Sequence, residues 1–173
     1  QCLEQMLLIN PDFAQITEIK ELPQSEFKQR EYHRPAGYAA TTRVHMGRLC
    51  IPALTDSGAT CSCITEEQMV LVVNHTIKMV SEGKLKQSDY NYPIRQFYQY
   101  KSEGLLKGAE KEGRLVVEYA VILRVEFIPE GSIRGPTKDL YFKIFKKGTC
   151  GVVGCVIGRP HLDFPDRGGE GLG

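Results

Sequence analysis

The chain has 173 residues, of which 42% are hydrophobic and 25% are charged, and its formal net charge is +1. These values are typical of one globular domain with room for an additional arm, and the near-neutral charge argues against a nucleic-acid-binding protein, which would carry a basic excess. The apolar runs are short and interrupted by charged residues, so no segment is predicted to span a membrane.

The first residues, QCLEQMLLIN, lack the charged and small-residue regions of a signal peptide. We therefore expect a protein that is not secreted and that lies in the cytoplasm or in a viral particle. The sequence lacks an initiator Met, so we expect either a fragment or a piece cut from a longer precursor. The six cysteines are expected to be reduced thiols, and neither they nor the histidines have metal-ligand spacing, so no metal and no cofactor are predicted.

Residues 1–37 are predicted to form an arm or linker, because a short helical pattern at the start is followed by polar, proline-containing sequence. From residue 38, YAATTRVHM predicts a strand, Gly47 begins a tight turn, and LCIPALT predicts a second strand. Thr65 and Gln68 match a capping box, so EEQMVLVV is expected to open a short helix.

The clearest pattern lies in residues 115–127, LVVEYAVILRVEF, where apolar side chains recur at every second position. This alternation predicts a long strand with one buried face. YPIRQFYQY predicts a strand before it, and the charged, glycine-bearing stretch between them predicts a β-hairpin with a mobile tip. LYFKIF predicts a further strand, so residues 38–165 are expected to form a mostly β domain and 166–173 a flexible tail.

One acidic residue stands at a predicted strand end. In ALTDSGATCSCI, Asp56 follows an apolar approach and precedes Ser57 and Gly58. The tripeptide alone is a weak signal, because such an aspartate often forms a surface turn. The context of Asp56 favours a functional site. A predicted strand precedes it, and Gly58 permits a sharp turn directly after it. The predicted hairpin follows at a distance suited to covering a cleft, and an apolar segment with a glycine, VVGCVIGRPHL, lies near the end of the chain.

Together these segments resemble the retropepsins, the aspartic proteases of retroviruses and retrotransposons. ALTDSGATCSCI is similar to the family's Asp-Thr/Ser-Gly-Ala signature, and CVIGRPHLDF is similar to its apolar pair before glycine. The two occur in the family's order, with a hairpin between them, over about residues 40–165. The resemblance implies a mostly β, closed-barrel acid-protease fold with a flap hairpin and one short C-terminal helix.

An aspartic protease needs two carboxylates that share one proton, so that one activates water while the other polarises the scissile carbonyl. This chain has one such motif, because no other aspartate is followed by Ser-Gly or Thr-Gly. The resemblance therefore implies a homodimer in which Asp56 meets its own copy on the two-fold axis. The implied activity is that of an aspartic endopeptidase cutting extended polypeptides, with a retroelement or viral polyprotein, including its own precursor, as the substrate.

The resemblance also implies roles for residues around Asp56. The residues that would support the active-site loop are Ser57, Gly58, Ala59 and Ser62. The residues that would contact substrate are Cys63, Val156 and Gly108, the last at the tip of a flap between about Lys101 and Arg114. Ile157 and Gly158 would pack behind the site.

The sequence departs from the family pattern beside the motif. Many retroviral members have an aspartate where this chain has Thr60, and that aspartate pairs with an arginine. Arg159 therefore either pairs with Asp163 or is solvated. His161 is expected to be structural or exposed rather than catalytic.

Three alternatives stay open. The expected flap is poorer in glycine and richer in charge than is usual in the family, and this departure and Thr60 are compatible with an inactive module that keeps the fold for dimerisation or binding. A Cys–His protease dyad using Cys61 or Cys150 is possible by residue type alone, because such partners meet only in the fold. An unrelated β-domain with a chance motif is the third.

Overall fold

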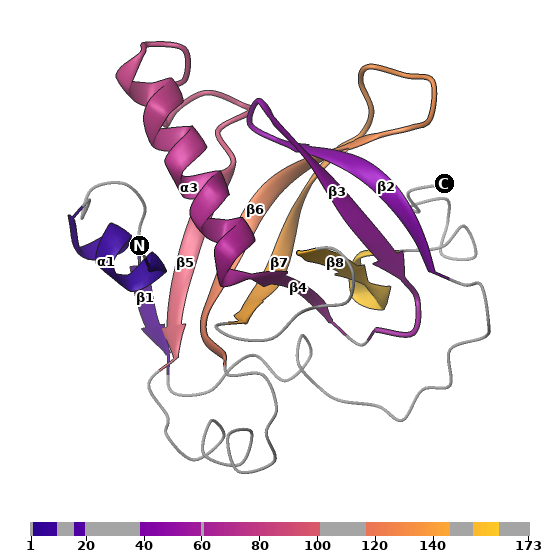
Figure 1. Ribbon diagram of the computed structural model, residues 1–173, viewed down its shortest axis with the longest axis horizontal. Coiled ribbons are helices and arrows are strands. Elements are labelled where there is room, and N and C mark those ends of the chain that lie inside the picture. The colour runs from indigo at the N-terminus through magenta and orange to yellow at the C-terminus, as the bar shows by residue number, and fades with distance from the viewer. Residues whose placement is uncertain are drawn as a thin grey trace.

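The computed structural model describes residues 2–9, 16–19, 39–59, 61–100, 117–145 and 154–162 (Figure 1). Its α-helices are α1 (Leu3–Ile9) and α3 (Glu66–Ser81). Its strands are β1 (Ile16–Ile19), β2 (Ala39–Met46), β3 (Leu49–Asp56), β4 (Ser62–Thr65), β5 (Ile94–Tyr100), β6 (Val117–Ile128), β7 (Thr137–Phe145) and β8 (Cys155–Gly158). A 3-10 turn, η1 (Arg159–His161), follows β8 directly.

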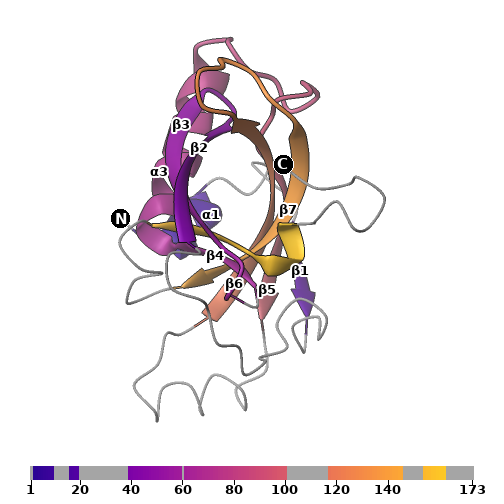
Figure 2. The ribbon, with the colours of Figure 1, turned by 90° about the vertical axis from the view of Figure 1, so that its right-hand side faces the viewer.

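The strands form one closed barrel. They lie in the order β1-β5-β6-β2-β3-β8-β4-β7, and β7 pairs back with β6. The ring therefore consists of β6, β2, β3, β8, β4 and β7, while β5 and β1 extend the sheet outward from β6. Figure 2 shows this ring with β2 and β3 on one side and β7 on the other. The predicted mostly β, closed-barrel fold class is confirmed.

Two hairpins contribute strands to the sheet. β2 and β3 pair antiparallel from Met46 and Leu49 outward, and Gly47 at the turn has φ +65°, a left-handed conformation that glycine adopts easily. β5 and β6 also pair antiparallel, with Phe97 opposite Val121. This pairing confirms the predicted hairpin at its base, whereas the expected flap tip, with Gly108, lies outside the described residues.

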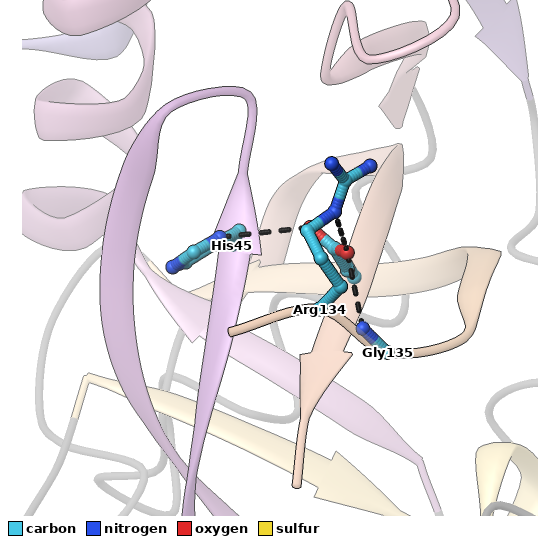
Figure 3. A network of polar contacts seen from close by, with 4 residues as sticks. His45, Arg134 and Gly135 are labelled. Carbon is cyan, nitrogen blue, oxygen red and sulfur yellow. Dashed lines mark hydrogen bonds and ion pairs between the residues drawn. The ribbon is translucent and has the colours of Figure 1, made fainter. Parts of the chain in front are cut away.

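A polar network fixes the turn between β6 and β7 (Figure 3). The Glu126 carboxylate accepts a hydrogen bond from Arg134 Nε at 2.9 Å and another from the Gly135 backbone N–H at 3.1 Å. His45 Nδ1 on β2 lies 3.6 Å from the same carboxylate. The network therefore joins this turn to the neighbouring strand β2.

Helix α3 begins as predicted, because the Thr65 side chain accepts a hydrogen bond from the Gln68 N–H at 3.2 Å. It extends to Ser81, well beyond the short helix that the sequence predicts. Its β-branched residues lower intrinsic helix propensity, but Val72 and Val73 are buried in the core, and this packing outweighs propensity.

The core is one continuous cluster that includes the barrel interior and the buried faces of α1 and α3. α1 lies inside the segment predicted to be an arm, and its residues Leu3, Met6 and Leu7 are buried in this cluster. In place of the expected short C-terminal helix, the described residues end in the single turn η1. No helix in the described ranges is long and apolar enough to cross a membrane.

Candidate active site

Asp56 is the last residue of β3, and it is 9% exposed. Its carboxylate Oδ1 accepts a hydrogen bond from the Gly58 N–H at 2.8 Å, and its backbone carbonyl accepts one from the Ala59 N–H at 3.0 Å. This is the Asx-turn that a strand-end aspartate commonly forms. Because Asp56 and Ser57 are both buried, however, the turn lies within the protein rather than on its surface.

Strand β8 brings the apolar segment that ends at Gly158 beside this turn. β3 and β8 pair in parallel, and Asp56 is the Cα partner of Gly158. A Cβ on Gly158 would lie 2.2 Å from the backbone oxygen of Cys61, so only glycine fits there. The Arg159 N–H donates to the Ala59 carbonyl at 2.9 Å, which ties the loop after Asp56 to the chain that follows β8.

Ser62 and His161 form a hydrogen-bonded brace beneath the loop. Ser62 Oγ accepts a hydrogen bond from the Gly158 N–H at 2.9 Å and lies 2.5 Å from His161 Nδ1. His161 Nε2 accepts a hydrogen bond from the Tyr141 backbone N–H at 3.3 Å. The brace therefore connects β4, β7 and β8 at the end of the barrel where Asp56 lies.

The hydrogen bonds of the brace determine which ring nitrogen of His161 carries the proton, and burial keeps the ring neutral. Because Nε2 accepts a hydrogen bond, the neutral ring carries its proton on Nδ1, and this proton is donated to Ser62 Oγ. Burial lowers the pKa of His161 from 6.5 to about 4, so the ring is neutral at pH 7. A neutral ring in this position has a structural role, consistent with the expectation from sequence.

Ser57 has a buried side chain, 4% exposed, whose hydroxyl makes no hydrogen bond to any part of the chain that the structure describes. An unsatisfied buried hydroxyl is costly and needs an explanation. A partner group from outside the described residues would satisfy it.

The predicted site residues divide into three groups. The loop and its immediate supports lie together: Asp56, Ser57, Gly58, Ala59, Ser62 and Gly158. Cys63 and Val156 are Cα partners on adjacent strands, and Ile157 is fully buried in the core. The residues outside the described ranges are Thr60, Gly108 and Asp163.

Two residues of the site region received no functional prediction from the sequence. His161 was expected only to be structural or exposed, and its brace depends on contacts with Ser62 and Tyr141. Lys143 on β7 is the Cα partner of Cys63. Its only signal in the sequence is a lysine in the otherwise apolar and aromatic strand LYFKIF, where it resembles an ordinary solvent-facing residue.

The cysteines that the structure describes are thiols, at positions 2, 50, 61, 63 and 155. No three His, Cys, Asp or Glu side chains in the described ranges are grouped so that they could hold a metal ion.

No family model matches the sequence, and no curated protein matches it. Among solved structures, the chain is similar to the retroviral protease-like domain of Ddi1 from Leishmania major. The two chains are 12% identical with a TM-score of 0.41, and the match covers 70% of this chain and 73% of the other. Membership of the retropepsin family stays a prediction from the sequence.

Proposed function

We propose that this protein is an aspartic endopeptidase that acts as a homodimer. The observation that carries the proposal is the setting of Asp56, a buried carboxylate at a strand end whose Oδ1 is held by the Gly58 N–H. Its neighbour across the β3–β8 pairing is Gly158, where an added Cβ would overlap the Cys61 backbone. This close packing holds the loop that carries the carboxylate in one position.

One carboxylate cannot act as acid and base at once, and the sequence contains a single Asp-Ser-Gly motif. A two-fold dimer would place two copies of Asp56 side by side, where mutual repulsion makes them share one proton. The ionised carboxylate would take a proton from water as the water attacks the scissile carbonyl. The protonated one would donate a hydrogen bond to the carbonyl oxygen.

The buried Ser57 hydroxyl supports a dimer, because it lacks a hydrogen-bond partner in the described residues and sits directly beside Asp56. A second copy would bring an equivalent loop, with its own hydroxyl, to the axis. The β5–β6 hairpin supports a polypeptide substrate, because a hairpin can add strand-like hydrogen bonds to an extended peptide. Processing of the precursor polyprotein of a retroelement or virus is the proposed role.

The test is peptide cleavage from acid to neutral pH by the purified chain, by Asp56→Asn and by Asp139→Asn, over a range of protein concentrations. Asp139 is a matched control, because it is an exposed aspartate on β7 that pairs with Arg124. We expect cleavage that rises more steeply than linearly with concentration, is unchanged in Asp139→Asn and is lost in Asp56→Asn.

Equal cleavage by the wild type and Asp56→Asn would overturn the assignment of Asp56. Absence of cleavage by the wild type, with dimers present in solution, would instead favour the inactive dimerisation or binding module. A cleaving activity lost on alkylation of thiols, but kept in Asp56→Asn, would favour a cysteine protease.

A further inference from the structure

Lys143 lies on the same face of the barrel wall as Asp56. Four residues on successive strands are Cα partners in one row, which runs Leu54, Val156, Cys63, Lys143 across β3, β8, β4 and β7. Partnered residues on neighbouring strands project their side chains from the same face of a sheet. Asp56 is two residues after Leu54 on β3, so it belongs to this face as well.

The opposite face of these strands is the barrel interior. The residues adjacent to the row along each strand are almost fully buried, with exposed fractions of 0–3%: Ala53, Cys155, Ile157, Ile64, Phe142 and Ile144. The row therefore lies on the outer face of the ring, where Cys63 and Val156 are largely buried and Leu54 and Lys143 are half-buried. Within the row, Cys63 and Val156 are the two residues already expected to contact substrate.

Lys143 is half-buried on this face, although a lysine on an outer barrel face is usually solvated. Burial lowers the pKa of Lys143, and the nearby thiols of Cys61 and Cys63, when ionised, act in the opposite direction. The electrostatic attraction between a lysine ammonium and a carboxylate is stronger at a half-buried position than at an exposed one, because the effective dielectric constant there is lower.

The row also gives the approximate distance between Lys143 and a scissile bond held at Asp56. Adjacent strands are about 4.8 Å apart, so three steps place the Cα atoms of Leu54 and Lys143 about 14 Å apart. An extended peptide advances about 3.3 Å per residue, and the flexible lysine stem shortens the gap. Lys143 is therefore within reach of a substrate side chain a few residues from the bond that is cut at Asp56.

We propose that Lys143 is a specificity-determining residue that selects substrates carrying an Asp or Glu side chain within a few residues of the scissile bond. This inference rests on the proposed peptidase function. In a two-fold dimer the second copy of Lys143 would lie on the other side of the scissile bond, so the acidic preference would occur on both sides.

The experiment compares the full chain with three variants. Lys143→Met removes the charge and keeps an apolar stem, Lys143→Glu reverses the charge, and Lys84→Met is the matched control. Lys84 follows helix α3 and has a side chain that is 54% exposed. Each protein is first incubated with a defined mixture of synthetic peptides, and cleavage sites are read by mass spectrometry. The best cleavage site is then remade as three peptides that differ only in having Glu, Gln or Lys at the preferred position.

The measured quantity is the ratio of kcat/KM for the Glu and Gln peptides within one variant, since any loss of folded protein cancels in this ratio. We expect the wild type and Lys84→Met to favour Glu by about tenfold, which corresponds to about 1.4 kcal/mol. The ratio should fall to about one in Lys143→Met, and Lys143→Glu should favour the Lys peptide. A ratio near one in the wild type, or a Glu preference that survives in Lys143→Met, would overturn the inference while leaving the peptidase function intact.

A second measurement decides the case in which the wild type cleaves no peptide. The probes are two fluorescent peptides with a non-hydrolysable hydroxyethylene group at the scissile position, flanked by Glu in one and Gln in the other, and binding is measured by anisotropy. Tighter binding of the Glu probe that disappears in Lys143→Met would support the inference although the proposed function had failed. Equal binding of the two probes, or binding of neither, would overturn it.

Discussion

At the scale of single residues, Gly158 is a position beside Asp56 where a side chain would overlap the backbone. A Cβ at this position would lie 2.2 Å from the backbone oxygen of Cys61, which directly precedes β4, and the pairing of β4 with β8 limits how far this backbone can move away. We expect Gly158→Ala to lower the free energy of unfolding by about 3 kcal/mol, as overpacking in a rigid site does. Urea denaturation of the wild type and of Gly158→Ala measures this difference in the free energy of unfolding.

Gly131→Ala separates steric overlap from backbone strain. Gly131 has φ +79° but nothing within 4 Å of an added Cβ, so its substitution should cost only about 1 kcal/mol. Equal costs at the two positions would contradict the close contact at Gly158.

His161 makes stability depend on pH. Its folded pKa of about 4 lies below the ordinary 6.5, so the unfolded chain binds the proton more readily between these values. Its contribution is therefore present above pH 6.5 and is lost as pH falls from 6.5 to 4, by up to about 3 kcal/mol. Protonation of Nε2 would turn the acceptor of the Tyr141 N–H into a donor.

Denaturant unfolding at several pH values tests this, with His161→Gln compared with the wild type. We expect His161→Gln to flatten the dependence of the free energy of unfolding on pH between pH 6.5 and 4. A slope that is the same in both proteins would show that His161 is not buried as a neutral ring.

At the scale of elements, the turn between β6 and β7 depends on Glu126. Burial raises the pKa of Glu126, but the Gly135 N–H, Arg134 and His45 together outweigh burial and lower it below its usual value. Its stabilising contribution is thus present at neutral pH and lost as pH falls through the lowered folded pKa. The Gly135 N–H donates a hydrogen bond to the Glu126 carboxylate and would lose this acceptor if the carboxylate were removed.

We expect Glu126→Ala to destabilise the protein by about 2 kcal/mol, because a part-buried N–H loses its acceptor. Arg134→Ala should cost less than about 0.5 kcal/mol, since the Arg134 side chain is 83% exposed and surface ion pairs contribute little. Thermal or urea unfolding of both variants makes the comparison. Equal losses would mean that the ion pair, and not the backbone hydrogen bond, holds the turn.

At the scale of the whole molecule, the buried Ser57 hydroxyl predicts opposite effects on the monomer and on the proposed dimer. Ser57→Ala removes a buried group that lacks a partner in the described residues, so the monomer should keep or gain stability. The dimer would lose a hydrogen bond at the axis, and its dissociation constant should rise about tenfold.

Sedimentation equilibrium gives the dissociation constant, and urea unfolding at low protein concentration gives the monomer stability. Ser81→Ala is the matched control, because Ser81 is an exposed serine at the end of α3. A Ser57→Ala monomer that is clearly less stable, with dimerisation unchanged, would place the hydroxyl's partner within the same chain.

The sequence by itself determined the local structure. The alternation in residues 115–127 predicted β6, the turn at Gly47 predicted the β2–β3 hairpin, and Thr65 with Gln68 marked the start of α3. These features depend on backbone conformation and side-chain period, which are properties of neighbouring residues. The position of Asp56 at a strand end was also readable, because a glycine follows it closely and an apolar strand precedes it.

Only the tertiary structure decided which strands meet. Alternation shows that a strand has a buried face but not which strand lies beside it, and the parallel pairs β3–β8 and β4–β7 join segments far apart in the chain. These pairings close the ring, place Gly158 against Asp56, and bring His161 and Lys143 to the site. The length of α3 was likewise set by packing, because burial of its β-branched residues outweighs their weak helix propensity.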